Sequence, residues 1–354
     1  MSVPPRNTEP GTRALPVAPG RFDSIEYSEQ FLTVSGWMFC PGRQLDTFRL
    51  KVNGGTMGGD VVPEARDGVQ KKFAGVSEAL MSGFRLRAVV PEKTFRNWAE
   101  VEVRGRVGGQ EVSQISMLYR PDYQAALVEA PAELRWRVTG SRNPIGVYWL
   151  AGLQTFGKFY RAITKYADRD PVNRLLDWGC GCGRVTGVIL KYLTGVEVHG
   201  CDIDREAVEW CARNFPTGHF TAIEPHPPTT YADSTFNVVT GCSVLSHLRR
   251  ELQFDWLKET NRIIAPGGLL LVSVHGDFAA NSFNPEVKKE VETVGISDRT
   301  PDHILDGIAP DSYYRGTFQS KAYTCREFAR FFKVLDYIEL GMGNLQDLVV
   351  MKKV

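Results

Sequence analysis

The stretch Leu175–Gly187, LLDWGCGCGRVTG, places Gly179, Gly181 and Gly183 at alternate positions around two cysteines. Apolar residues before it predict a short strand, and apolar residues at helical spacing after it predict a helix. Glycines let the backbone turn sharply and let a ligand approach without a Cβ clash. A helix N-terminus adds free N–H groups. The order strand, glycine loop, helix therefore predicts a loop that holds a nucleotide.

A carboxylate follows at the end of the next predicted strand. Glu197–Cys201 is expected to form that strand, and Asp202 ends it. An acid roughly twenty residues beyond a glycine loop is positioned to bind the ribose hydroxyls of a nucleotide. Asp204 can cap the helix that follows, which leaves Asp202 free for the ribose and Ile203 for the adenine.

The loop differs from a dinucleotide fingerprint. That fingerprint, started at Gly179, needs glycine where the chain has Arg184. Asp177 precedes the first glycine by two residues, where an acid would repel a pyrophosphate but could receive an ammonium group, directly or through water. The pattern D-x-G-x-G-x-G resembles motif I of class I S-adenosylmethionine (SAM)-dependent methyltransferases. An NAD-dependent oxidoreductase is the disfavoured alternative.

Further segments resemble the same superfamily in the same order. They are YADSTFNVVTGCSVLSHL, the Pro-Gly-Gly turn with its strand, and the final strands VLDYIEL and QDLVVMKK. The resemblance covers about residues 173–354. It implies an α/β fold, a Rossmann-like seven-stranded methyltransferase sheet with an antiparallel last strand, and SAM as cofactor.

The same resemblance implies a set of cofactor contacts. Asp177 and Gly179 would hold the methionine end, Gly181 and Gly183 would give backbone clearance, and Cys180 would fill a small-residue position of the loop. Asp202 would bind the ribose and Ile203 the adenine. Cys242 and Ser243 would lie beside the sulfonium.

Two histidines are candidate bases for a hydroxyl acceptor. His247 and His275 follow the fourth and fifth predicted strands of the sheet, at the carboxyl edge where open α/β folds bind ligands. The unperturbed pKa of histidine suits proton removal near neutral pH. Asp277 could orient a base or bind a sugar hydroxyl. Local hydrogen bonding, loop packing and solvation are the competing roles for these three residues.

The acceptor is suggested by a closer resemblance. Five segments together resemble those of bacterial methyltransferases associated with surface-polysaccharide biosynthesis. They are DWGCGCGR, DIDREAVEWC, SVLSHL, VHGD and QDLVV. This implies O-methylation of a sugar or glycan hydroxyl. Methylation of nitrogen on a small molecule or protein, and a non-catalytic module that binds SAM and a glycan, are the alternatives. Residues 278–323 form a long connection, and Tyr313 and Tyr314 within it could contact a sugar-like acceptor.

The chain divides into four predicted parts. Residues 1–20 are proline-rich and predict a disordered tail. Residues 21–119 contain short alternating strands and turn signals, which predict a small all-β sandwich, and the pattern GWMF…SGFRL resembles accessory modules of glycan enzymes. Residues 120–172 predict a linker and the first helices of the catalytic domain, and 173–354 the methyltransferase domain.

The net charge, the apolar runs and the cysteine content of the chain argue against several classes of protein. A net charge of +1 gives no reason to expect a nucleic-acid partner. No apolar run reaches the roughly 18 residues that span a bilayer, and the N-terminus lacks a signal-peptide core. We therefore expect a cytoplasmic protein, with peripheral association with a glycan-assembly complex left open. Seven cysteines without a C-x-x-C pair predict neither a disulfide framework nor a metal site.

Overall fold

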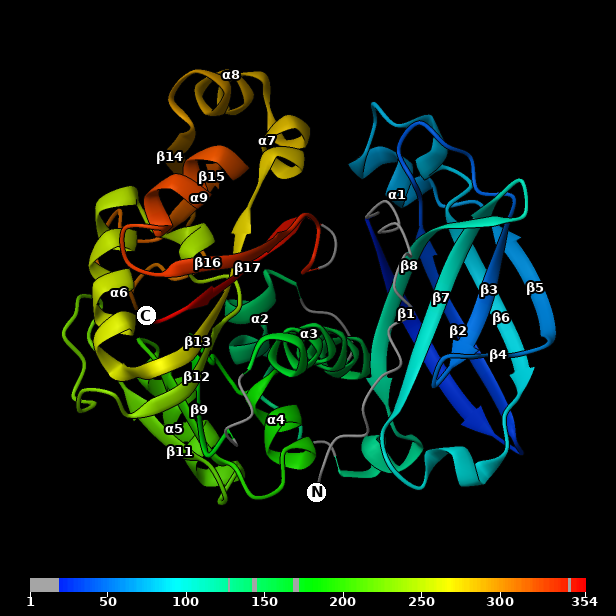
Figure 1. Cartoon of the computed structure of the whole chain (residues 1–354), viewed down its shortest axis with the longest axis horizontal. Helices are drawn as coiled ribbons and strands as arrows, with labels where there is room; N and C mark the ends of the chain where they lie inside the picture. The colour runs from blue at the N-terminus through cyan, green and yellow to red at the C-terminus, as the bar shows by residue number, and fades with distance from the viewer. Residues whose placement is uncertain (1–18, 127, 142–144, 168–171, 343–344) are drawn as a thin grey trace.

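The computed structural model describes residues 19–126, 128–141, 145–167, 172–342 and 345–354. An all-β region, coloured blue to cyan, lies beside a larger α/β region, coloured green to red (Figure 1). Most of the predicted N-terminal tail, residues 1–18, lies outside the described residues. Gly20, the last residue of that tail, is instead the first residue of strand β1.

The all-β region consists of two four-stranded antiparallel sheets with the orders β1-β2-β6-β5 and β4-β3-β7-β8. Side chains that alternate along the strands form its core, and Phe48 of one sheet packs against Phe84 of the other with ring centroids 5.0 Å apart. The strands are β1 (Gly20–Ser28), β2 (Phe31–Met38), β3 (Thr47–Val52), β4 (Gly55–Thr56), β5 (Gly59–Glu64), β6 (Gly83–Val89), β7 (Ala99–Val107) and β8 (Gln110–Tyr119). Short helices α1 (Asp67–Lys72), η1 (Ser77–Ala79) and η2 (Glu92–Phe95) connect them.

One long helix joins the two regions. After η3 (Pro121–Ala126) and α2 (Ala132–Thr139), α3 (Ile145–Tyr166) packs against β1 and β8 on one side and against α4 and β13 on the other (Figure 1). The Gln154 side chain extends the contact, because it accepts a hydrogen bond from Phe22 N–H and donates one to Phe22 O, both at 3.1 Å. One hydrophobic core therefore runs from the β-sheets through α3 into the α/β region.

Two glycines let α3 fit between its neighbours. A Cβ on Gly152 would lie 2.3 Å from the carbonyl oxygen of Arg184 in the glycine loop, and one on Gly157 would lie 3.2 Å from the backbone nitrogen of Leu118 in β8. Real Cβ atoms do not approach backbone as closely as the first of these distances. The small residues on α3 thus set how closely the helix covers the glycine loop.

The α/β region is built on a nine-stranded sheet. Seven strands follow the order β11-β10-β9-β12-β13-β17-β16, in which β17 is antiparallel to both its neighbours and the first five are parallel. They are β9 (Arg174–Trp178), β10 (Glu197–Asp202), β11 (His219–Ala222), β12 (Phe236–Gly241), β13 (Ile264–His275), β16 (Lys333–Ile338) and β17 (Gln346–Lys352). These seven match the expected methyltransferase sheet, including its antiparallel closing pair.

Two further strands correct the expected total of seven. β14 (Ile296–Pro301) and β15 (Arg315–Gln319) come from the long connection after β13, and β15 pairs with β13 only at His275. β17 occupies one edge of β13 along its length, while β12 ends at Gly241 opposite Val272. The end of β13 therefore has a free edge, which β15 fills, because an unpaired buried strand edge would leave backbone groups unsatisfied.

Helices cover both faces of this sheet because its central strands are apolar on both sides. Leu269 and Leu271 of β13 face the core shared with α3, while Leu270 and Val272 face the opposite core. The remaining helices are α4 (Thr186–Tyr192), α5 (Arg205–Asn214), η4 (Leu245–His247), α6 (Arg250–Ile263), α7 (Asp277–Phe283), α8 (Pro285–Val294) and α9 (Lys321–Phe328). Among the described residues, no helix has both the length and the apolarity needed to span a membrane.

Candidate active site

Two neighbouring cavities open at the carboxyl edge of the parallel strands. The first, which we name the loop cavity, is lined by the glycine loop, the end of β10 and the residues after β12. The second, the α3 cavity, is lined by one face of α3, the end of α2 and the residues around His247. Both lie where open α/β sheets bind ligands, outside the carboxyl ends of strands.

The glycine loop turns through left-handed backbone conformations. Gly179, Gly181 and Gly183 have φ angles of +74°, +51° and +76°, which residues with a Cβ adopt at a cost of about 1–2 kcal/mol. Gly179 and Gly181 line the loop cavity. Gly183 does not: a Cβ there would meet the Phe215 ring at 2.5 Å. The expected ligand clearance at Gly183 is therefore corrected to close packing of the loop against the residue that ends α5.

Asp177 contributes a buried carboxylate to the loop cavity. It is only 2 % exposed, and its two oxygens accept hydrogen bonds from Thr186 at 2.6 Å and Thr240 at 3.3 Å. Burial raises the pKa of this carboxyl from 3.8 to about 6. Each carboxylate oxygen keeps a free lone pair, so the group is oriented by protein and still able to accept from an ammonium.

Asp202 lies at the end of β10 and holds the loop in place. One of its oxygens accepts from Gly181 N–H at 2.7 Å, and the other accepts from Asp204 N–H at 2.9 Å. Burial raises the pKa of Asp202 above its usual value. Asp204 caps α5 through Ala207 N–H and pairs with Arg137 of α2 at 3.0 Å. Asp204 therefore caps α5 as the sequence predicts, while the ribose contact of Asp202 stays a prediction.

Apolar and aromatic side chains line another part of the loop cavity. Ile203 lines it as expected, together with Ile223, Trp256 and Tyr313. The Tyr313 hydroxyl donates to Pro225 O at 2.5 Å, which fixes the ring. A flat apolar slot beside a strand-end carboxylate suits an adenine next to its ribose.

The cysteines serve as small buried residues. All seven are free, and Cys180 and Cys182 are buried in the loop. Burial raises the pKa of Cys182 to about 12, so it is a thiol, and it shares a 2.8 Å hydrogen bond with the Tyr148 hydroxyl. Cys180 lines the loop cavity as expected.

Six residues line both cavities at their junction: Arg137, Val138, Arg184, Cys242, Ser243 and Tyr314. Ser243 has a φ of +60°, a conformation that a non-glycine residue adopts only when its surroundings impose it. Its N–H donates to Ser273 Oγ at 2.7 Å, and its hydroxyl donates to Gln346 Oε1 at 3.1 Å. These bonds hold the backbone after β12 at the place where the two cavities meet.

His247 lies in the α3 cavity beside this junction. Its ring stacks on Tyr314 with centroids 4.3 Å apart and planes 5° apart. Its Nδ1 is 3.3 Å from Asp302 Oδ2, and this contact is the main reason that the pKa of Asp302 is lowered. The structure describes no partner for His247 Nε2 within the described residues. A carboxylate beside one ring nitrogen and a free second nitrogen is the arrangement of an oriented general base.

His275 is held differently. Its Nδ1–H donates to Thr317 O at 3.2 Å, so Nε2 accepts from Gln346 Nε2, also at 3.2 Å. Burial, with a smaller effect from His247, lowers the pKa of His275 to about 4. It lines the α3 cavity, but both nitrogens are engaged and the ring is a weak base. Its place in the chain of bonds from Ser243 through Gln346 makes it a positioning residue.

Asp277 is separate from both cavities. It begins α7, and its carboxylate accepts a hydrogen bond from Lys321 N–H at 3.0 Å. It is absent from the described lining of both cavities. The sequence places it correctly after the strand, but α7 begins there and directs the carboxylate to the start of α9. The expectation that Asp277 orients a base is therefore corrected: Asp302 has that position.

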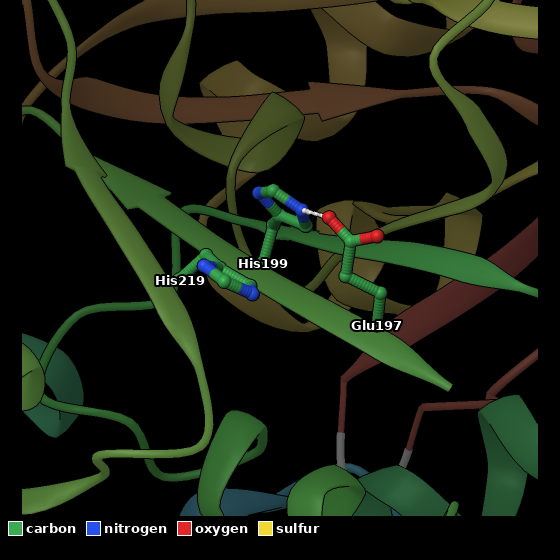
Figure 2. Close-up of side chains that lie close together, drawn as sticks. All are labelled: Glu197, His199 and His219. Carbon is green, nitrogen blue, oxygen red and sulfur yellow. Dashed lines mark hydrogen bonds and ion pairs between the residues drawn. The ribbon is translucent and has the colours of Figure 1, made fainter. Parts of the chain in front are cut away.

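A third group of titratable side chains lies elsewhere. Glu197 and His199 of β10 and His219 of β11 come together, with potential ligand atoms within 4.8 Å of one another (Figure 2). His199 and His219 are direct partners in the parallel ladder, and their rings stack with centroids 4.8 Å apart. Glu197 also pairs with Arg174 at 2.9 Å. The group is near the amino end of β10, opposite the edge that carries the cavities.

The residues that line the loop cavity fit SAM. Asp177 can accept from the ammonium of its methionine part, Asp202 has lone pairs left for the ribose hydroxyls, and Ile203 lies on the adenine side. Two basic side chains also line this cavity: Arg137 pairs with Asp204 at 3.0 Å, and Arg184 Nη2 lies 3.9 Å from Cys242 Sγ. The fold and the cavity define a class of enzyme that handles a sulfonium nucleoside.

Comparison with known proteins supports this class. Residues 176–270 match the family model described as a methyltransferase domain. The part of the chain that holds the glycine loop and the carboxyl ends of the central strands is therefore similar to a methyltransferase domain.

Solved structures with a similar arrangement include SAM-dependent methyltransferases from three organisms. The protein from Methanosarcina mazei is 18% identical, with 54% of this chain and 96% of that chain covered and a TM-score of 0.40. The protein from Aquifex aeolicus is 14% identical, covering 64% and 100%, with a TM-score of 0.40. The protein from Mesorhizobium loti is 13% identical, covering 55% and 97%, also with a TM-score of 0.40.

Sequence reasoning missed three residues of the site. Asp302, Lys158 and Arg137 lie far from motif I in sequence and line the α3 cavity. A helical face does carry a signal for Lys158, because Tyr148, Ala151, Thr155 and Lys158 recur at helical spacing and all line that cavity. Asp302 and Arg137 carry no local signal, since only the folded chain brings the long connection and α2 to the sheet edge.

Proposed function

We propose that this enzyme methylates a hydroxyl of a sugar or glycan, with His247 as the general base. The observation that carries the proposal is the His247–Asp302 pair at the junction of the two cavities, with Nδ1 and Oδ2 3.3 Å apart. A donor in the loop cavity and an acceptor in the α3 cavity would meet beside Cys242 and Ser243, which line both.

The chemistry needs positioning and one proton transfer. When bound, SAM would supply the methyl group to the acceptor oxygen and keep the carbon–sulfur electron pair on its sulfur, and His247 would take the proton of the acceptor hydroxyl. Holding the reacting atoms about 3–3.5 Å apart supplies much of the rate enhancement. Asp302 then stabilises the imidazolium that forms, and Tyr314 holds the ring by stacking.

The all-β region supports a role with a carbohydrate acceptor. Arg21 of β1 lines the α3 cavity, so this region forms part of the acceptor wall as well as packing against α3. The resemblance of its strands to modules of glycan enzymes points the same way. We propose that the enzyme acts in glycan assembly.

Transfer of a labelled methyl group tests the proposal. Wild-type enzyme, labelled SAM and a panel of bacterial surface glycans and activated sugars should give label that survives as a methyl ether on isolated sugar. His247→Asn should lower kcat by about 100- to 10,000-fold, the usual contribution of a general base. His303→Asn is the matched control, because His303 is exposed and its ion pair among the described residues is with Asp306.

Two outcomes contradict the proposal. Label found only on amines of the panel would mean N-methylation. Equal rates for wild type and His247→Asn, with correctly folded variants by circular dichroism, would remove His247 from the chemistry.

A further inference from the structure

The α3 cavity is strongly cationic. The described residues that line it include one carboxylate, Asp302, which is already paired with His247. The cationic side chains that line it are Arg21, Arg135, Arg137, Lys158 and Arg184. A concave site with this excess of positive charge attracts anions and concentrates them.

Partners within the protein neutralise some of these cations. The ion pairs are Arg21–Asp23 at 2.9 Å, Arg135–Glu129 at 3.1 Å and Arg137–Asp204 at 3.0 Å. Charges paired in this way contribute little to an incoming ligand. The excess charge of the cavity therefore rests on Lys158 and Arg184.

Neither of these two has a carboxylate partner among the residues that the structure describes. Arg184 Nη2 lies 3.9 Å from Cys242 Sγ, and its Nε is buried without a hydrogen-bond partner. Buried donors in folded proteins are normally satisfied by protein, water or a ligand. The guanidinium is thus held at the junction of the cavities with unused hydrogen-bonding capacity.

Lys158 lines the same cavity from α3. It lies on the helix face that also carries Tyr148, Ala151 and Thr155 into the cavity lining. Burial lowers the pKa of Lys158 to about 8. A desolvated ammonium without a counter-ion is unfavourable, so an anion placed here would gain a charge-assisted hydrogen bond and relieve that cost.

We propose that the acceptor carries an anionic group, a carboxylate or a phosphate, which Lys158 and Arg184 bind beside the hydroxyl to be methylated. This inference rests on the proposed function and specifies its substrate class: an acidic sugar or a phosphorylated sugar, and not a neutral one. Arg184 lines both cavities and so also faces the donor, whereas Lys158 lines the α3 cavity alone. Lys158 is therefore the position that tests the acceptor by itself.

Binding measured by calorimetry, with S-adenosylhomocysteine filling the loop cavity, tests this without any turnover. The probes are a disaccharide that contains glucuronic acid, UDP-glucose and the neutral disaccharide cellobiose. At least one anionic probe should bind ten-fold or more tighter than cellobiose. Lys158→Met should weaken that binding by about 10- to 100-fold, the usual effect of removing one charge-assisted hydrogen bond.

Matched variants control for folding and for general charge. Lys165→Met removes a cation from the same helix that is exposed and pairs with Asp336 outside the cavity, and it should change nothing. Lys158→Arg keeps the charge and should retain most of the affinity for the anion. All variants should bind S-adenosylhomocysteine as wild type does. The affinity of wild type for the anion should fall as pH rises through about 8, because the ammonium is lost.

The outcomes separate this inference from the proposed function. Preference for the glucuronic acid probe supports a carboxylate, and preference for UDP-glucose supports a phosphate. Equal binding of all three probes, or unchanged binding in Lys158→Met, overturns the anionic acceptor. It would leave O-methylation of a neutral sugar standing, since methyl transfer is measured independently.

Discussion

The loop cavity and the α3 cavity share a wall but differ in charge balance. Among the described residues, Asp177, Asp202 and Asp204 line the first together with Arg137 and Arg184, whereas five Arg and Lys side chains and a single carboxylate line the second. A sulfonium donor with an ammonium group suits the acidic cavity, and the basic cavity repels it. Charge, as well as the shape of each cavity, therefore determines which of the two substrates binds on which side of their junction.

The largest expected effect concerns the buried carboxylate of Asp177. Folding raises its pKa from 3.8 to about 6, so the folded protein holds the proton more tightly than the unfolded chain. Its contribution to stability is therefore most favourable below pH 4 and is lost as pH rises to about 6. The difference between the two values corresponds to about 3 kcal/mol. Asp177→Asn should gain that amount relative to wild type between pH 4 and 7, measured by urea unfolding.

Asp347 provides the control for this prediction. Burial raises its pKa to about 6 as well, but it bonds to Tyr337 and Leu340 and is not in the lining of either cavity. Asp347→Asn should show the same pH trend in stability and bind SAM normally, whereas Asp177→Asn should bind SAM more weakly. A pH-independent difference between Asp177→Asn and wild type would contradict the buried charge.

The second-largest effect is expected for Asp202, which would bind the ribose of SAM and not its methionine part. Asp202→Asn should weaken SAM binding by about 10- to 100-fold, since it changes hydrogen bonds that involve a charged group. Binding of adenosine distinguishes the roles of the two acids, because adenosine lacks the methionine part. The affinity for adenosine should fall in Asp202→Asn and stay unchanged in Asp177→Asn. Unchanged adenosine affinity in Asp202→Asn would mean that this carboxylate serves only Gly181 and Asp204.

Gly152 tests the wall that the cavities share. Gly152→Ala places a Cβ 2.3 Å from Arg184 O, and overpacking of this kind destabilises a core by about 1–3 kcal/mol. Both SAM affinity and acceptor affinity should fall, because Arg184 lines both cavities. Gly146→Ala on the same helix meets no atom within 4 Å, and it should stabilise the protein by up to about 1 kcal/mol. Thermal unfolding of the two variants would distinguish them; equal melting temperatures would count against the close approach.

The smallest effect is expected for Asp302. Asp302→Asn should lower kcat by about ten-fold or less, since the imidazolium that forms on proton transfer would lose the carboxylate beside it. Affinity for SAM should not change. Asp306→Asn, which alters an exposed partner of His303, is the control. An Asp302→Asn variant that keeps the wild-type kcat would show that Asp302 does not act through His247.

Much of the fold could be predicted from local sequence. Alternation along the strands gave the two antiparallel sheets, as in β6, where Phe84, Leu86 and Ala88 are buried and Arg85 and Arg87 are exposed. Periodicity around the glycine loop gave β9, α4, β10 and α5. These elements are specified by side chains next to each other in the chain, which is why a pattern suffices to locate them.

The candidate site likewise has one part that local sequence predicts and one part that it does not. The loop cavity is made by residues that follow consecutive strands, so the sequence by itself determined Asp177, Gly179, Cys180, Gly181, Asp202, Ile203, Cys242 and Ser243 as its lining. The α3 cavity and the extra strands β14 and β15 are evident only in the tertiary structure. The same is true of the position of Asp302, in place of the predicted Asp277, beside the candidate base, and of the unpaired charge of Lys158. The physical reason is that burial, pairing and charge balance depend on segments distant in the chain, which no local pattern encodes.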